Sequence, residues 1–354
     1  MTAAVARGDS QQPSPDVQAF DHRPVLLQEA VESLHVIPQG SYVDATYGRG
    51  GHSALILQQL GPSGRLIAFD RDPTAVAAGR KIYDQRFQII HAPFSELPQR
   101  LAEQGIDQVD GVLADLGVSS PQLDDPQRGF SFRLQGPLDM RMDPTRGEPV
   151  SAWIAKASVD ELQKVIKDYG EERFAVQIAN AIATRCASAA RGEAEPLQRT
   201  EDLAELVVQT LRRCRARREP GQHPATRTFQ ALRIHINREM EELTALLEAA
   251  VRLLRESGRL AIISFHSLED RLVKQFFRDA ARTAPPAPDR GISRSQRALL
   301  SGLQDRLGRP ANDSRLRVIG RIRPREEEIA ANPRARSAML RVAERCGTAL
   351  EPAR

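Results

Sequence analysis

The segment of residues 41–70 constrains the fold more than any other part of the chain. A β-rich run at 42–45 leads into a loop with glycines at positions 48, 50 and 51. A helix-like stretch at 52–60 and a second apolar run that ends on Asp70 follow. In doubly wound α/β sheets this order holds a nucleoside, because glycine lets the backbone approach the ligand and a strand-terminal carboxylate accepts hydrogen bonds from the ribose. The sequence therefore predicts an α/β sheet that binds an adenosine-containing cofactor.

One missing glycine separates the possible cofactor classes. A dinucleotide loop has the pattern G-x-G-x-x-G, whose third glycine permits close packing of helix and strand. Counted from Gly48, the third glycine position holds Ser53, and no G-x-x-x-x-G-K-[ST] phosphate loop occurs in the chain. The loop therefore favours S-adenosylmethionine over a nucleoside triphosphate. A NAD-dependent dehydrogenase on the same type of sheet is the competing hypothesis, and a glycine turn without a ligand is the simplest alternative.

Three successive β/α units imply a parallel sheet. A third strand is predicted at 87–90 and a fourth at 109–115, which again ends on a carboxylate, Asp115. The carboxyl ends of parallel strands lie along one edge of the sheet, where ligands bind. The glycine loop, Asp70, Phe94 and Asp115 all fall at these ends. Their shared placement supports a cofactor site more strongly than any single residue does.

The strand pattern is interrupted after residue 115. Residues 116–149 are rich in Gly, Pro, Asp and Ser, which predicts a long loop covering the site. A helical pattern follows at 150–220, where Ser158 and Glu161 form a capping box, and a long helix is predicted at 228–256. A helical domain inserted between the fourth and fifth strands explains this order.

Three late β-like runs complete the expected architecture, a Rossmann-like α/β sheet of seven strands. These runs lie at 258–265, 316–322 and 338–342, with a Pro- and Arg-rich exposed loop at 283–313 between them. The expected parts are a disordered tail at 1–20, a sheet domain at 21–140 and 225–345, an inserted helical domain at 141–224, and a second tail at 346–354.

Arginine dominates the basic residues of a chain with a formal net charge of +4. Only five of the 50 basic residues are lysines. Arginine suits contacts with phosphates and bases, although a GC-rich genome produces the same bias through its codons. The three cysteines form no C-x-x-C pair, and no apolar run resembles a signal peptide or a membrane span. We expect a cytoplasmic protein with no structural zinc and no membrane partner, and the sequence leaves its oligomeric state open.

With these segments in place, the chain resembles the bacterial 16S ribosomal RNA cytosine-N4 methyltransferases from about residue 22 to residue 345. The motifs that carry the resemblance are HRPVLL at 22–27, DATYGRGGHS at 44–53, DLGVSSPQLD at 115–124, RGFSF at 128–132, PLDMRMD at 137–143, TFQALRIHIN at 228–237, SFHSLEDR at 264–271 and NPRARS at 332–337. Eight motifs in the family's order make coincidence a poor explanation. Tyr47, where the family often has phenylalanine, is a mild departure.

The resemblance implies a fold, a cofactor and a substrate. The fold is a class I methyltransferase sheet interrupted by a helical domain that helps to hold RNA, and the cofactor is S-adenosyl-L-methionine. The substrate is the exocyclic N4 amine of a cytidine in the decoding region of 16S rRNA, expected within the 30S subunit. The positions that match the family's cofactor contacts are Gly50, Gly51, His52, Asp70, Phe94, Asp115 and Gln122. Of these, Gln122 is the one that spacing alone does not indicate.

The motif after the fifth strand supplies candidates for holding the cytidine. Ser264 and His266 follow that strand and are expected to open toward the cofactor, whereas Ser267 capping the next helix is the structural alternative. Positioning and a preorganised polar site are expected to carry the reaction, without a metal and without a covalent enzyme intermediate. A non-enzymatic RNA-binding assembly factor with the same fold is the remaining alternative.

Overall fold

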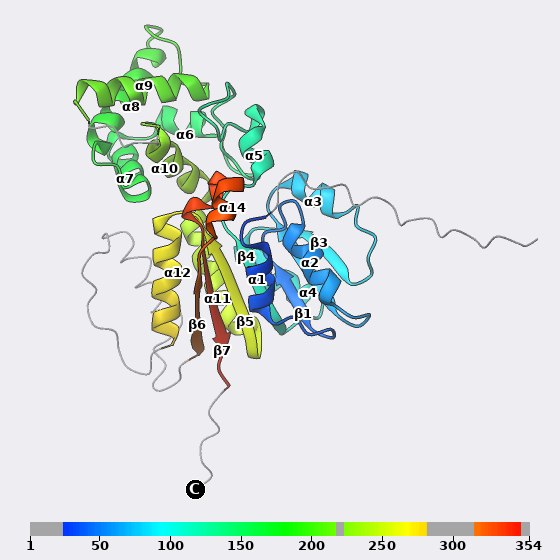
Figure 1. The fold of residues 1–354 in the computed structure, drawn as a ribbon. Helices are drawn as coiled ribbons and strands as arrows, with labels where there is room; N and C mark the ends of the chain where they lie inside the picture. The colour runs from blue at the N-terminus through cyan, green and yellow to red at the C-terminus, as the bar shows by residue number, and fades with distance from the viewer. Residues whose placement is uncertain (1–23, 217–222, 282–314, 348–354) are drawn as a thin grey trace, which may run out of the picture.

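The computed structural model describes residues 24–216, 223–281 and 315–347, and a seven-stranded sheet lies at its centre (Figure 1). The strands are β1 (Ser41–Asp44), β2 (Arg65–Asp70), β3 (Phe87–His91), β4 (Val109–Asp115), β5 (Leu254–Ser264), β6 (Leu316–Ile322) and β7 (Met339–Arg345). They lie in the order β3-β2-β1-β4-β5-β7-β6, and β7 alone runs against the others. This seven-stranded mixed sheet confirms the predicted Rossmann-like fold class.

Helices cover both faces of the sheet and extend beyond one end. They are α1 (Leu27–Leu34), α2 (Gly51–Gln59), α3 (Pro73–Gly79), η1 (Phe94–Glu96), α4 (Leu97–Glu103), α5 (Ser120–Asp124), η2 (Pro126–Arg128), α6 (Val150–Lys156), α7 (Val159–Gly170), α8 (Ala175–Ala190), α9 (Thr200–Arg213), α10 (Thr226–Asn237), α11 (Glu239–Leu253), α12 (Ser267–Ala280), α14 (Glu326–Ala331) and η3 (Pro333–Ser337).

Alternating strand residues build two separate cores on the sheet. Tyr42 and Leu66 point to the face covered by α1 and α2, whereas their neighbours Val43 and Ile67 point to the face covered by α4, α11 and α12. Because successive strand residues point to opposite faces, a strand that is buried on both sides is apolar almost throughout. This arrangement fixes the strands and leaves their carboxyl ends free for a site.

A third core lies among the helices that follow β4. It joins apolar side chains from the loop after α5 through α10, between Phe130 and Leu232. Figure 1 shows α6–α9 beyond the end of the sheet at which the parallel strands finish. The predicted capping box is present at the start of α7, where Ser158 Oγ accepts from Glu161 N. We propose that the part of the chain built around this core is the inserted helical domain, which the sequence placed at 141–224.

The long helix predicted at 228–256 is wrong, and the difference matters for the site. The structure has two helices, α10 and α11, separated by Arg238 in the left-handed conformation (φ 51°), and residue 254 already begins β5. The apolar periodicity continues across the break, so it gives no sign of a turn. The side chain of Asn237 donates to Met140 O and accepts from Met142 N, and these long-range contacts hold the turn in place.

Several predicted segments fall outside the described residues. These are the tail at 1–20, residues 22 and 23 of the first motif, the end of the helical stretch predicted at 150–220, the loop at 283–313 and most of the tail at 346–354. Within the residues that the structure describes, no helix is both long enough and apolar enough to cross a bilayer.

Candidate active site

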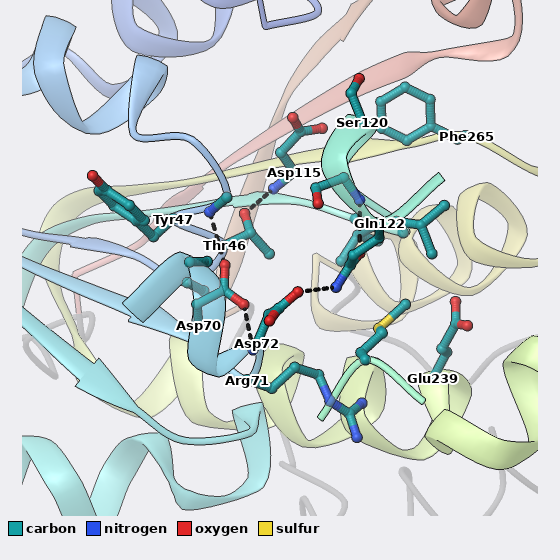
Figure 2. Close-up of a pocket in the computed structure, with 18 of the residues that line it drawn as sticks. Thr46, Tyr47, Asp70, Arg71, Asp72, Asp115, Ser120, Gln122, Glu239 and Phe265 are labelled. Atoms are coloured by element: carbon teal, nitrogen blue, oxygen red, sulfur yellow. Dashed lines mark hydrogen bonds between the residues drawn. The ribbon is translucent and has the colours of Figure 1, made fainter. Parts of the chain in front are cut away.

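A cavity of about 390 Å³ lies where the parallel strands end. Its volume is within the range of small-molecule sites. One side, which we call the strand-end wall, comprises the glycine loop, His52, Asp70, Phe94 and Asp115. The other side, the helix-junction wall, comprises Arg233, Glu239, Phe265 and Glu269. In Figure 2, Thr46, Tyr47 and Asp70 lie on one side of the cavity, and Phe265 and Glu239 lie on the other.

The glycine loop between β1 and α2 needs its glycines for two reasons. Gly48 and Gly50 adopt positive φ angles of 55° and 79°, which residues with a side chain rarely adopt. A Cβ atom on Gly51 would lie 2.3 Å from Pro24 Cγ, so Pro24 leaves no room for a side chain at this position. Gly48 and Gly51 line the cavity, whereas Gly50 is the N-cap of α2. The predicted cofactor loop is therefore a tight backbone turn at the edge of the cavity.

Asp70, the last residue of β2, organises the backbone around it. Its two carboxylate oxygens accept from Gly48 N and Asp72 N, each at 2.8 Å. Burial raises the pKa of Asp70 to about 6, and the two backbone N–H groups only partly offset this rise. Each oxygen can still accept a further hydrogen bond, because a carboxylate has about four acceptor positions. Asp70 is therefore placed to accept hydrogen bonds from a ribose.

Asp115 and His52 each have a buried polar atom without a hydrogen-bond partner among the described residues. These atoms are Asp115 Oδ1 and His52 Nε2. Burial raises the pKa of Asp115 well above its usual value, and the nearby carboxylates of Asp44 and Glu269 raise it further. Burial lowers the pKa of His52 to about 4, so its imidazole is neutral at pH 7, and its Nδ1 lies 4.0 Å from Asp115 Oδ2. A bound group that carries positive charge would stabilise the Asp115 carboxylate.

Phe94 and Gln122, the two remaining predicted cofactor contacts, also line the cavity. Phe94 begins η1, and the next residue, Ser95, is held through its backbone and hydroxyl by Glu242 of α11. Gln122 is buried, and its amide is engaged at both ends: Nε2 donates to Asp72 Oδ2, and Oε1 accepts from Ser119 N. The structure therefore gives Gln122 a definite part in positioning α5.

Arg128 ties the loop predicted to cover the site to the strand-end side of the cavity and braces the loop internally. Its guanidinium donates to Asp72 Oδ2 at 2.7 Å and to Met142 O at 2.8 Å. Asp72 also caps α3 by accepting from Thr74 N. Asp72 and Arg128 were not predicted as partners at the site, because a buried ion pair between residues 56 positions apart leaves no local signal.

Ser264 and His266, the predicted cytidine ligands, lie beside the cavity without lining it. The Ser264 hydroxyl is buried and donates to Met339 O. His266 is the N-cap of α12: its Nδ1 accepts from Glu269 N at 3.4 Å, and its Nε2 lies 3.1 Å from Glu269 Oε1. The cap predicted at Ser267 as the structural alternative is thus wrong by one residue. The roles of Ser264 and His266 toward a cytidine stay predictions.

The neighbours of these two residues take the positions inside the cavity. Phe265 and Glu269 line it, together with Arg233 from α10 and Glu239 from α11. Among the described residues, Glu239, His266 and Glu269 are the group whose ligand atoms lie close enough to hold a metal ion, within 4.8 Å of one another. Both oxygens of Glu239, however, already accept from Arg233 at 2.8 Å. Sequence reasoning missed Arg233 and Glu239 because it placed them within one continuous helix.

The residues present fit S-adenosylmethionine. Asp70 offers acceptors for ribose hydroxyls, the glycine loop exposes backbone, and the unpartnered oxygen of Asp115 is matched to a positively charged ligand. The cavity also extends beyond these groups to the helix-junction wall, which leaves room for a second ligand.

Comparisons with known proteins point to one family. The sequence pattern of the MraW methylase family matches residues 19–346. A relative from Azoarcus sp., named ribosomal RNA small subunit methyltransferase H, is 56% identical over 334 residues, which cover 93% of this chain and 98% of that protein. A relative of the same name from Burkholderia mallei is 53% identical over 326 residues, covering 92% and 98%.

Among solved structures, an S-adenosylmethionine-dependent O-methyltransferase from Thermotoga maritima aligns with a TM-score of 0.37 at 10% identity, over 92% of this chain and 66% of that one. The family match extends over nearly the whole chain and includes the glycine loop and every strand. The chain belongs to the MraW methylase family.

Proposed function

We propose that this enzyme methylates the exocyclic N4 amine of a cytidine in the decoding region of 16S rRNA, within the 30S subunit. The observation that carries the proposal is the cavity itself, in which a cofactor loop and strand-end carboxylates face a second polar wall. The names of the relatives support a small-subunit ribosomal RNA as substrate, and the motifs shared with cytosine-N4 methyltransferases support the acceptor atom. As a methylase, the protein is neither a NAD-dependent dehydrogenase nor a purely structural assembly factor.

The strand-end wall would hold the cofactor. When bound, S-adenosylmethionine supplies an electrophilic methyl group on a positively charged sulfur. Asp70 would accept from the ribose hydroxyls, and Phe94 would lie against the adenine. The backbone at Gly50 and Gly51 would lie along the amino-acid part, with His52 and Asp115 beside it. Gln122 would act mainly by holding α5 against this wall.

The protein must also orient the amine that receives the methyl group. The N4 lone pair of cytosine is delocalised into the ring, so hydrogen-bond acceptors are needed to fix the N–H groups and direct the lone pair. Asp115, at the end of β4, and Glu269, which follows β5, line the cavity and would offer carboxylate acceptors for this task. The catalytic gain then comes from positioning in a preorganised polar site. The cytosine must be unpaired or turned out of its stack to enter the cavity.

The arginine-rich composition supports an RNA partner, and the assembled 30S particle is the favoured form of the substrate. A protein with this partner works in the cytoplasm, where ribosomes assemble. We expect the reaction to need no metal ion as a catalyst.

The proposal is tested with small subunits from a strain that lacks this gene. Purified protein is incubated with labelled S-adenosylmethionine and either 30S particles or naked 16S rRNA, and the RNA is digested to nucleosides for mass spectrometry. We expect label in N4-methylcytidine, with more label from the particle than from naked RNA. Label in another nucleoside, or no label despite tight binding of S-adenosylhomocysteine, would show that the proposed acceptor is wrong.

A further inference from the structure

The helix-junction wall contains a buried ion pair that the cofactor does not explain. Arg233, near the end of α10, donates through Nε and Nη2 to the two oxygens of Glu239, the first residue of α11, each at 2.8 Å. The side chains are 16% and 8% exposed, and both line the cavity. Within the described residues, the third guanidinium nitrogen of Arg233, Nη1, makes no hydrogen bond to a side chain or to the backbone.

The Arg233–Glu239 pair lies in the part of the cavity that is next to the carboxyl ends of β4 and β5. Ligand atoms of Glu239 and Glu269 lie within 4.8 Å of each other, and the Glu269 carboxylate is held by Phe265 N at 2.8 Å. Glu269 is in turn close enough to raise the pKa of Asp115, at the end of β4. Arg233 and Glu239 are thus neighbours of the position where the amine must meet the methyl group.

We infer that Arg233 and Glu239 together recognise the base-pairing edge of the target cytosine, and that Phe265 supplies an aromatic surface beside it. This inference rests on the proposed function and adds the residues that select the base. Glu239 offers acceptors for the N4–H group, and Arg233 offers donors for the N3 and O2 acceptors of the ring. A guanidinium–carboxylate pair therefore presents the complement of a cytosine edge.

A purely structural ion pair is a poor explanation for this arrangement. Burying two charges is costly, and well-packed apolar residues can replace such a pair without loss of stability. The junction between α10 and α11 already has its own support, because Asn237 bonds to the backbone at Met140 and Met142. Both residues line the cavity, where Arg233 Nη1 keeps its donors and each Glu239 oxygen keeps a further acceptor position beyond its bond to Arg233.

The same chemistry predicts discrimination between cytidine and uridine. Uracil has an oxygen where cytosine has its N4 amine, so the carboxylate of Glu239 would face another acceptor and lose a hydrogen bond. Sites that bind a substrate N–H group reject analogues that lack it strongly, because buried polar groups are then left unpaired. Selection of the base would therefore be tied to the amine that is methylated.

The test compares Glu239→Gln with a matched control, Glu241→Gln. Both changes remove one negative charge from the first turn of α11, but Glu241 is outside the cavity and contacts Tyr169 at 3.5 Å. Reconstituted 30S particles that differ only in cytidine or uridine at the target position are bound to enzyme loaded with S-adenosylhomocysteine. The dissociation constants for both particles, kcat/KM on the cytidine particle, S-adenosylhomocysteine affinity and Tm are measured.

We expect the wild-type enzyme and Glu241→Gln to prefer the cytidine particle by about tenfold or more, which corresponds to one hydrogen bond with a charged group. Glu239→Gln should lose most of this preference and about 100-fold in kcat/KM, while S-adenosylhomocysteine affinity stays within about twofold. Should Glu239→Gln not fold, Arg233→Lys provides the second variant, because it keeps the charge but not the forked geometry.

A variant that keeps the wild-type preference for cytidine overturns the inference. So does a loss of activity accompanied only by a lower Tm or weaker cofactor binding, since that pattern marks a structural pair. If the wild-type enzyme binds both particles but methylates neither, the proposed function fails, and the ratio of the two dissociation constants still decides whether this pair selects the base.

Discussion

The strand-end wall comes from residues 48–115, where each functional group follows a strand within a few positions, whereas the helix-junction wall is assembled from α10, α11 and the start of α12. The first wall is built by local rules, because a glycine loop and strand-terminal carboxylates appear wherever a β/α unit binds a nucleoside. The second wall depends on a helix break and on long-range packing. One molecule thus combines a wall that follows from its fold with a wall that follows from its tertiary contacts, and we propose that the first binds the cofactor and the second binds the acceptor.

Removing Asp70 should give the largest effect on cofactor affinity and should act on the strand-end wall alone. We expect Asp70→Ala to weaken S-adenosylhomocysteine binding by about 100-fold or more, because the ribose loses hydrogen bonds to a charged group and the N–H groups of Gly48 and Asp72 lose their acceptor. Isothermal titration calorimetry measures this effect. If cofactor affinity were unchanged in a folded variant, Asp70 would not be part of the cofactor site.

Arg128 joins the covering loop to the strand-end wall, so removing its side chain should mainly lower the free energy of unfolding. Arg128→Ala leaves the Asp72 carboxylate buried without its cation, which should lower the free energy of unfolding by about 3–5 kcal/mol. Urea unfolding followed by circular dichroism measures the change. The control is Arg146→Ala in the same loop, whose half-exposed ion pairs should contribute about 1 kcal/mol or less. Equal losses for the two variants would contradict this account of the loop.

Acidic pH should weaken binding of both the cofactor and its demethylated product. The pKa values of Asp44 and Asp70 are raised to about 6, mainly by burial, so both carboxylates are ionised at pH 7 and become protonated as the pH falls to 5. A protonated Asp70 accepts hydrogen bonds less well from the ribose, which both ligands carry, so affinity for S-adenosylmethionine and for S-adenosylhomocysteine should each fall by about tenfold over this range. Titrations of both ligands at several pH values test this. Affinities that stay constant between pH 7 and pH 5 would show that Asp70 does not contribute to ligand binding.

The smallest effect is expected far from both walls. Ser158→Ala removes the capping box of α7 in the inserted helical domain and should lower the free energy of unfolding by about 1 kcal/mol. Affinity for S-adenosylhomocysteine should not change, since α7 does not reach the cavity. A loss of cofactor affinity in this variant would mean that the helical core and the strand-end wall are coupled more closely than their separate packing indicates.

The sequence predicts the strand-end wall well because its signals are local. The glycine loop, Asp70, Phe94 and Asp115 each follow an apolar strand, and the structure places them around one cavity. Gln122 was indicated by resemblance alone, and its amide bonds to Asp72 and Ser119 show why spacing gives no sign of it.

The helix-junction wall could not be predicted in the same way. The periodic pattern at 228–256 hides the left-handed Arg238, and without that break Arg233 and Glu239 do not meet. In the motif at 264–271, sequence reasoning selected Ser264 and His266, whereas Phe265 and Glu269 line the cavity. The seven-stranded order was likewise expected as a fold class, but the pairing of β5 with β7 is a long-range contact that only the structure gives.

A crystal structure of the enzyme with S-adenosylhomocysteine and cytidine would test most directly whether the two walls bind two different ligands. We predict the ribose of S-adenosylhomocysteine within hydrogen-bonding distance of Asp70, and the cytosine edge within hydrogen-bonding distance of Arg233 and Glu239. A cofactor seated against the helix-junction wall, or a cytosine that contacts neither Arg233 nor Glu239, would contradict this division of the cavity.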